Sequence, residues 1–388
     1  MKTKRIGLVS LVLAASITCF IILYDYDYQP STDFDETESH LLVWSKHHQK
    51  TYVNFIKNLA EDDHVTLYVP KSSTKDSVHH KLTAFGVNMD NVQLEVIKNE
   101  NIWIRDFGPV FLMNKSGKMK TLSFKFHEYA DNLFPYEYQA IMKQRLRASH
   151  LVGIGGAREL NGKGLAILVE KHEQNANPNL SKDEIAKELK KKLGIKKIIW
   201  LKSGLPQDEL LSTKPLWGGI FTNGAGNHID SFCRFISSNT VLLAQVKTNE
   251  IASNPILALA NKRLEENYNI LKNALDQDGK PLTIIRVPMA PLLFEEEANF
   301  DVKQIFVRSN SYLNFIITKN KVIVPSYATY MKNQDAISKD SETENLFKSI
   351  FPGKKIVMLD CIDLNRNGGG FHCISINRPK KKNRKKAA

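Results

Sequence analysis

The segment that decides the fold is residues 229–246, IDSFCRFISSNTVLLAQV, with the apolar stretch that follows it. Two runs rich in β-branched and aromatic residues, Ile229–Ile236 and Thr240–Val246, flank a short polar turn and predict a β-hairpin. Apolar residues then recur at helical spacing over Pro255–Leu275, and Leu282–Val287 again has the composition of a strand. The segment therefore predicts one strand–strand–helix–strand unit.

The same order of elements recurs along the chain. The best-marked copy is the hairpin Glu159–Glu170, which turns at an Asn-Gly pair and precedes a helix over Lys182–Leu193. A capping box at the start of this helix and a glycine directly after it mark both of its ends. About five such units fit in the chain, and repeated units of this kind bury their apolar faces against one another, which favours a closed ring. The other expected strands and helices are Leu41–Trp44, Tyr52–Leu59, Val65–Val69, Val110–Met113, Thr121–Phe124, Tyr312–Thr318, Lys321–Val324, Glu344–Ile350 and Lys355–Leu359.

Three short motifs carry chemically useful side chains. Residues 368–373, GGGFHC, place a thiol after a glycine bend that lets a ligand approach closely. Residues 103–109, WIRDFGP, put a carboxylate before a turn, and residues 227–230, NHID, space a histidine and an aspartate so that both face one side of an extended strand. Each motif alone is compatible with a structural role. Together they supply a nucleophile, a proton carrier and two anions, which suits attack on a cationic carbon.

In this order and at these separations, the three motifs resemble those of the agmatine deiminase and bacterial-type peptidylarginine deiminase family of the guanidine-modifying superfamily. The resemblance runs from Leu41 to Pro379. It implies an α/β fold, a five-bladed α/β propeller (pentein) of repeated ββαβ units. It also implies a single catalytic domain over residues 40–379 with the active site in the central channel.

The resemblance also implies a role for each motif residue. Asp106 and Asp230 would grip a planar guanidinium, which is always protonated and is a poor electrophile for water. Cys373 would attack the guanidinium carbon, and His228 would protonate the departing nitrogen and later deprotonate the attacking water. The expected reaction is guanidinium C–N hydrolysis that releases ammonia through a covalent thiouronium intermediate on Cys373.

Neighbouring residues receive lesser roles. Asn314 matches a polar residue near the family's nucleophile, and Trp103 is either a packing aromatic or the lining for the substrate's aliphatic stem. His372 is expected to point away from the site and to be structural. Cys233 and Cys361 are interpreted as buried packing cysteines.

The chain departs from the agmatine enzymes in two places. Ile154 stands where those enzymes usually carry a glutamate, and residues 224–227, GAGN, replace their Thr-Asp-Gly. Arg158 has two open roles, contact with a substrate carboxylate or a solvated charge on the hairpin. The two departures argue against agmatine, and an exported location, expected from residues 1–30, favours peptidyl-arginine, converted to citrulline. Agmatine, converted to N-carbamoylputrescine, is the alternative. A catalytically silent, membrane-tethered guanidinium-binding protein and a Cys-His-Asn amidase are the competing hypotheses.

The two ends of the chain carry most of its formal net charge of +13. Seven positive charges lie in residues 378–386 and three in residues 2–5, so the body is nearly neutral and no nucleic-acid partner is expected. Residues 1–30 resemble a signal peptide or signal anchor, which predicts contact with the membrane and a catalytic domain outside it, with a cytoplasmic location as the alternative. Residues 380–388 are expected to be a disordered basic tail. No metal or cofactor motif is present, and the three cysteines of the body leave at least one free thiol, expected to be Cys373.

Overall fold

The computed structural model describes residues 28–126, 134–143, 146–212, 214–299 and 302–381. The predicted leader, residues 1–30, lies almost wholly outside these ranges, as does the tail from residue 382. Among the described residues, no helix combines the length and the apolar character needed to cross a bilayer.

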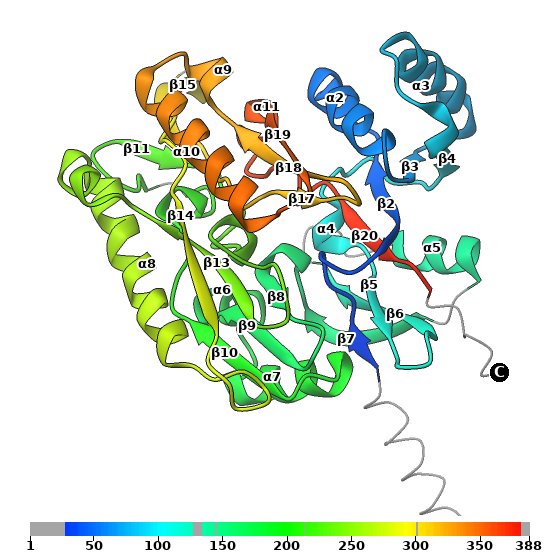
Figure 1. Ribbon diagram of the computed structural model, residues 1–388, viewed down its shortest axis with the longest axis horizontal. Coiled ribbons are helices and arrows are strands. Elements are labelled where there is room, and N and C mark those ends of the chain that lie inside the picture. The colour runs from blue at the N-terminus through cyan, green and yellow to red at the C-terminus, as the bar shows by residue number, and fades with distance from the viewer. Residues whose placement is uncertain (1–27, 127–133, 144–145, 213, 300–301, 382–388) are drawn as a thin grey trace, which may run out of the picture.

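Four sheets share one order of pairing, in which two antiparallel strands are followed by a third strand parallel to the second (Figure 1). This is the repeated unit that the sequence predicts. The strands are β5 (Val110–Met113), β6 (Met119–Lys125) and β7 (Leu146–Val152); β8 (Arg158–Leu160), β9 (Leu165–Val169) and β10 (Lys197–Leu201); β12 (Cys233–Phe235), β13 (Thr240–Gln245) and β14 (Thr283–Pro288); and β17 (Ile316–Ile317), β18 (Lys321–Ser326) and β19 (Lys355–Asp360).

A fifth sheet joins the two ends of the described chain. β20 (Ile376–Pro379) pairs antiparallel with β2 (Thr37–Val43), which is parallel to β3 (Val65–Val69), itself parallel to β4 (Val92–Val96). Figure 1 shows β20, in red, beside β2, in blue. Its first two pairs follow the same antiparallel and parallel order as in the other four sheets, and β4 adds a second parallel pair.

Helices lie around the periphery of these sheets (Figure 1). The helix that the sequence marks best, α7 (Lys182–Leu193), has the predicted capping box and ends at Gly194 in the left-handed conformation. Its apolar stripe is buried in a cluster with residues of β9, which explains why its polar face can remain solvated. The other helices are α2 (Gln49–Ala60), α3 (Ser72–Ala84), α4 (Ile104–Phe107), α5 (Phe134–Met142), α6 (Glu170–Ala176), α8 (Pro255–Asn273), α9 (Ala328–Met331), α10 (Gln334–Ile350) and α11 (Ile362–Asn365).

Several predicted elements differ from the structure. The first strand of the hairpin at residues 229–246 begins only at Cys233, because Ile229–Ser231 forms a 3₁₀ turn, η4. The strand expected over Tyr312–Thr318 shrinks to Ile316–Ile317, and the helix expected over Glu344–Ile350 begins ten residues earlier, at Gln334. A sixth sheet was not predicted; it consists of β11 (Ile220–Thr222), β16 (Val302–Val307) and β15 (Phe294–Asn299).

Candidate active site

The backbone of the glycine run before Cys373 passes close to two side chains. A Cβ at Gly369 would lie 2.2 Å from a ring carbon of Trp103, and a Cβ at Gly370 would lie 2.5 Å from the side-chain oxygen of Asn314. Only glycine fits such close approaches. Trp103 thus packs against the segment that carries the nucleophile, as a packing aromatic would, and Asn314 adjoins the same segment.

A short helix presents Asp106 on the other side of this segment. α4 ends before a glycine at position 108, and the backbone N–H of Arg105 donates to the Cys373 carbonyl over 3.1 Å. The 103–109 motif was expected to end a strand and instead forms this helical turn. The consequence for the site is the same, because the turn fixes the Asp106 carboxyl beside the Cys373 backbone.

Three of the predicted catalytic residues converge on Gly156. A Cβ added there would lie 2.8 Å from His228 Nδ1, 3.0 Å from Asp230 Oδ2 and 3.1 Å from Asp106 Oδ1. The Gly156 N–H donates to Asp106 Oδ1 over 3.2 Å. The glycine therefore leaves open the space around which the imidazole and the two carboxyls meet.

Cys373 lies at the same place with its thiol free and almost fully buried. Asn314 Nδ2 donates to the sulfur over 3.3 Å, and the thiol lies 3.7 Å from Asp230 Oδ2. Burial, reinforced by the nearby carboxyls of Asp230 and Asp106, raises the pKa of the thiol well above its usual value. These surroundings therefore disfavour the thiolate form of Cys373.

His228 is fixed through its backbone and not through its ring. Its N–H donates to Asp208 Oδ2 over 2.7 Å, whereas neither ring nitrogen has a hydrogen-bond partner among the described residues. Burial, with the neighbouring His172 ring 5.1 Å away, lowers the pKa of His228 to about 3. A neutral imidazole with both nitrogens unengaged is free to exchange a proton with a bound molecule.

The two carboxyls of the site have opposite electrostatic properties. Burial and the adjacent Asp230 raise the pKa of Asp106 well above the usual value. Burial acts in the same direction on Asp230, but hydrogen bonding to His372 and the charges near it hold the pKa of Asp230 below the usual value. The surroundings thus favour ionisation of Asp230 and disfavour that of Asp106, and a bound cation would favour ionisation of both.

His372 corrects one expectation. Its side chain was expected to face away, yet its Nδ1 lies 2.7 Å from Asp230 Oδ2 and its Nε2 lies 2.7 Å from Asp33 Oδ2. Asp33 was missed altogether. It is 339 residues away from His372 in the chain, and no local motif marks it.

Arg158 is neither a solvated charge nor a free contact for a substrate carboxylate. It is buried, and its guanidinium forms paired bonds of 2.7 and 2.9 Å to the carboxylate of Glu173. Cys233 and Cys361 are free and buried, as predicted. Arg158 is therefore engaged in the fold.

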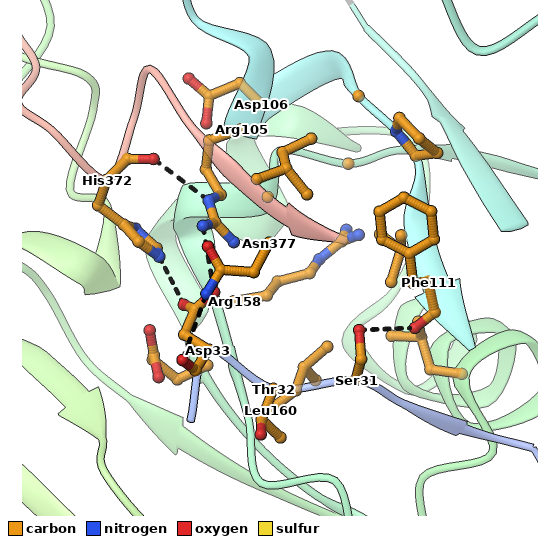
Figure 2. Close-up of a pocket in the computed structure, with 18 of the residues that line it drawn as sticks. Ser31, Thr32, Asp33, Arg105, Asp106, Phe111, Arg158, Leu160, His372 and Asn377 are labelled. Carbon is orange, nitrogen blue, oxygen red and sulfur yellow. Dashed lines mark hydrogen bonds and ion pairs between the residues drawn. The ribbon is translucent and has the colours of Figure 1, made fainter. Parts of the chain in front are cut away.

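A cavity opens behind this cluster (Figure 2). Its lining includes Asp33, Arg105, Asp106 and His372 but not Cys373. Figure 2 shows the His372 ring and the Arg105 guanidinium both directed at Asp33. The candidate catalytic cluster therefore also borders this cavity, whose lining includes charged side chains. We call the side of the cluster that faces the cavity its second face.

Comparison with known proteins places the chain in a family. The family model of Porphyromonas-type peptidyl-arginine deiminases matches residues 33–379. The agmatine deiminase of Pseudomonas syringae pv. tomato is 26% identical, covering 85% of this chain and 87% of its own length. The agmatine deiminase of Ectopseudomonas mendocina is 27% identical, covering 75% and 77%.

Solved structures agree on the fold. The C. jejuni agmatine deiminase superposes with a TM-score of 0.69 at 23% identity, covering 91% of this chain and 96% of its own. The Enterococcus faecalis agmatine deiminase gives 0.73 at 20% identity, covering 92% and 97%. The predicted α/β fold class is confirmed. The chain therefore belongs to the family of Porphyromonas-type peptidyl-arginine deiminases and agmatine deiminases, hydrolases that act on carbon–nitrogen bonds.

Proposed function

We propose that this guanidino deiminase acts on agmatine, releasing ammonia and N-carbamoylputrescine. The observation that carries the chemistry is the convergence of a buried thiol, an imidazole and two carboxyls around Gly156. The choice of agmatine is supported by the agmatine deiminases that match this chain over most of their length. The preference for peptidyl-arginine drawn from the sequence becomes the second candidate.

The proposed reaction starts when the guanidinium is held between Asp230 and Asp106. The positive charge of the substrate opposes the effects that raise the thiol pKa, so the thiolate forms only once substrate is bound. The sulfur of Cys373 attacks the guanidinium carbon, forming a C–S bond and a tetrahedral carbon. His228 accepts the thiol proton as the thiolate forms and then gives this proton to one amino nitrogen; the C–N bond breaks and ammonia leaves.

The second half of the reaction releases the product. The neutral His228 ring accepts a proton from water as the water oxygen attacks the carbon of the thiouronium intermediate. The C–S bond then breaks and returns its electron pair to Cys373, leaving a ureido product. Because the same imidazole acts first as acid and then as base, its two unengaged ring nitrogens are what the mechanism requires.

Two residues bear on the substrate's far end. Ile154 offers no charge to agmatine's distal amine, and this is the observation that favours peptidyl-arginine as the second candidate. Arg158 is paired with Glu173, so it offers no free cation to the carboxylate of free arginine. Free arginine is therefore expected to be the poorest of the three substrates.

The test is ammonia release by the whole chain with agmatine, an arginyl peptide and free arginine in parallel, with Cys373→Ala as the control. Agmatine is expected to give the highest kcat/KM. Ammonia from the arginyl peptide alone would replace agmatine by the second candidate. Ammonia from none of the three would support the silent guanidinium-binding protein.

We also propose, from the pattern of residues 1–30, that the chain is exported or membrane-anchored with its catalytic domain outside the membrane. Fractionation of cells that make the full chain, followed by sequencing of its N-terminus, tests this. Recovery of the intact chain in the cytosol would favour the cytoplasmic alternative.

A further inference from the structure

The first described residues, Tyr28–Glu36, run along the second face of the catalytic cluster, and we call them the N-terminal strap. β1 (Gln29–Pro30) pairs antiparallel with β5. The Ser31 N–H donates to the Phe111 carbonyl over 2.9 Å, and the Lys380 N–H donates to the Glu36 carbonyl over 2.8 Å. The strap is thus fixed at both of its ends and carries Asp33 between them.

Asp33 connects to the nucleophile through two side chains. Its Oδ2 lies 2.7 Å from His372 Nε2, and His372 Nδ1 lies 2.7 Å from Asp230 Oδ2. Asp230 Oδ2 is the oxygen that lies 3.7 Å from the Cys373 sulfur. Strap, imidazole, carboxyl and thiol therefore form one continuous chain of contacts across the wall between the two faces.

Proton counting constrains this chain of groups. A carboxylate donates no proton, so the two short contacts to the imidazole need two protons among Asp33, His372 and Asp230. Either the ring is an imidazolium between two carboxylates, or it is neutral and one carboxyl is protonated. The three groups carry a net charge of −1 in both cases. Two cations lie beside them, Arg105 at 3.2 Å and Arg234 at 2.9 Å from Asp33, and Arg234 is also paired with Glu159 over 2.8 Å.

We propose that Asp33, acting through His372, is a positioning residue that keeps the Asp230 carboxylate ionised and aimed at the guanidinium site. This inference rests on the proposed function, because it assigns Asp230 to the grip on the substrate. Without the charge of Asp33, the same geometry is satisfied by a neutral ring and a protonated Asp230. A protonated carboxyl holds a guanidinium poorly, since it has lost its charge and one acceptor.

The charges around Asp33 and Asp230 decide the direction in which the pKa of Asp230 would move if Asp33 lost its charge. Burial opposes ionisation of Asp33, but Arg105, His372 and Arg234 hold its pKa well below the usual value. Bonding to His372 lowers the pKa of Asp230 in the same way against its own burial. Loss of the Asp33 charge should therefore raise the pKa of Asp230. The charged or titratable groups that face these two carboxyls are Arg105, Asp106, Glu159, His172, Asp208, His228, Arg234, His372 and Cys373.

The first test is the pH profile of kcat/KM for ammonia release from agmatine by Asp33→Asn. The expected result is an acid limb moved up by about one pH unit, so that kcat/KM at a pH within this limb is about tenfold lower than that of the unsubstituted chain. Asp35→Asn is the matched control, because Asp35 lies in the same strap and its carboxylate only accepts the Thr32 N–H over 2.8 Å. Asp33→Glu retains the charge and should restore the wild-type limb.

Stability is measured on each variant first, because an asparagine at position 33 turns an amide N–H toward Arg105. An unshifted acid limb in Asp33→Asn overturns the proposal. So does an equal fall of kcat/KM at all pH values, since that is what loss of folded protein alone produces. His372→Gln should move the limb in the same direction as Asp33→Asn, because glutamine donates to Asp230 without a charge.

A second measurement separates this proposal from the proposed function. Chloroacetamidine carries a planar cation and alkylates a thiol with loss of chloride, whereas iodoacetamide is neutral and does so with loss of iodide. Mass spectrometry of the Cys373 peptide gives the ratio of the two rates at a pH within the acid limb, without any turnover. The ratio should fall about tenfold in Asp33→Asn and hold in Asp35→Asn. An unchanged ratio refutes the positioning role even if no guanidino compound is turned over.

Discussion

The surroundings of Asp106 disfavour its charge. Burial and the neighbouring Asp230 raise its pKa well above the usual value, which favours the protonated carboxyl over the carboxylate. Binding of a guanidinium should therefore expel a proton.

Calorimetric titration of Cys373→Ala with agmatine at pH 7 checks this prediction. The enthalpy measured in two buffers with different ionisation enthalpies should differ by the value expected for release of about one proton. Asp106→Asn, which has no proton to release there, should abolish the difference. Equal enthalpies in both buffers for Cys373→Ala would show that Asp106 is already ionised in the empty site.

Gly156 is the second residue whose substitution is informative. A methyl group there would lie within 2.8 to 3.1 Å of His228, Asp230 and Asp106, which forces the three side chains apart. Misplacement of reacting groups by less than 1 Å is costly, so Gly156→Ala should lower kcat/KM for agmatine by about 10²-fold. Gly353→Ala is the control. Its φ of +85° strains the new side chain in open space, so it should cost about 1 kcal/mol of stability and leave kcat/KM unchanged.

Some residues of the candidate site can be identified from the sequence and others cannot. Cys373, His228 and Asp106 sit in motifs whose residue types are unusual together, and the structure brings all three to one place. Asp33 and His372 illustrate the opposite case. Their contact depends on strand pairing between the two ends of the chain, and no local pattern encodes the distance between residues so far apart in sequence.

At the scale of elements, local signals predicted well only where local interactions decide the conformation. α7 has its capping box, its apolar stripe and its terminal glycine within one stretch, and its bounds are those expected. Residues 229–231 were included in the predicted strand Ile229–Ile236 although aspartate is depleted in strands, and they form a 3₁₀ turn in which Asp230 reaches His372. The sixth sheet was missed because β15, FEEEAN, has no apolar alternation.

α7 also provides a test of these local signals. Ser181→Ala removes the side chain that accepts the Glu184 N–H and should cost about 1 kcal/mol in the free energy of unfolding. Gly194→Ala should cost more, because its φ is +67° and the new Cβ would lie 2.3 Å from the Tyr28 carbonyl oxygen. Urea unfolding measures both. Lys187→Ala, on the exposed face, should change stability by less than about 0.5 kcal/mol, and an equal loss in all three would refute the capping argument.

For the molecule as a whole, the site depends on contacts between the first and the last described segments of the chain. β20 follows Cys373 by three residues and pairs with β2, near the other end of the described chain. Asn377 also donates to the Asp33 carbonyl over 3.3 Å and contacts His40 over 3.2 Å. The pairing of β20 with β2 therefore also fixes the position of Cys373.

Truncation of the C-terminus tests that coupling. A chain that ends at Ser375 loses all of β20, leaves β2 with unpaired backbone groups and exposes residues packed against Ile376, which is only 6% exposed. It should lose cooperative thermal unfolding and all ammonia release. A chain that ends at Lys381 keeps β20 and the bond from Lys380 to Glu36, so its unfolding midpoint and its kcat/KM should equal those of the full chain. Activity in the Ser375 truncation would show that the sheet holds the nucleophile without its last strand, whereas loss of activity in the Lys381 truncation would assign residues 382–388 a part in the site.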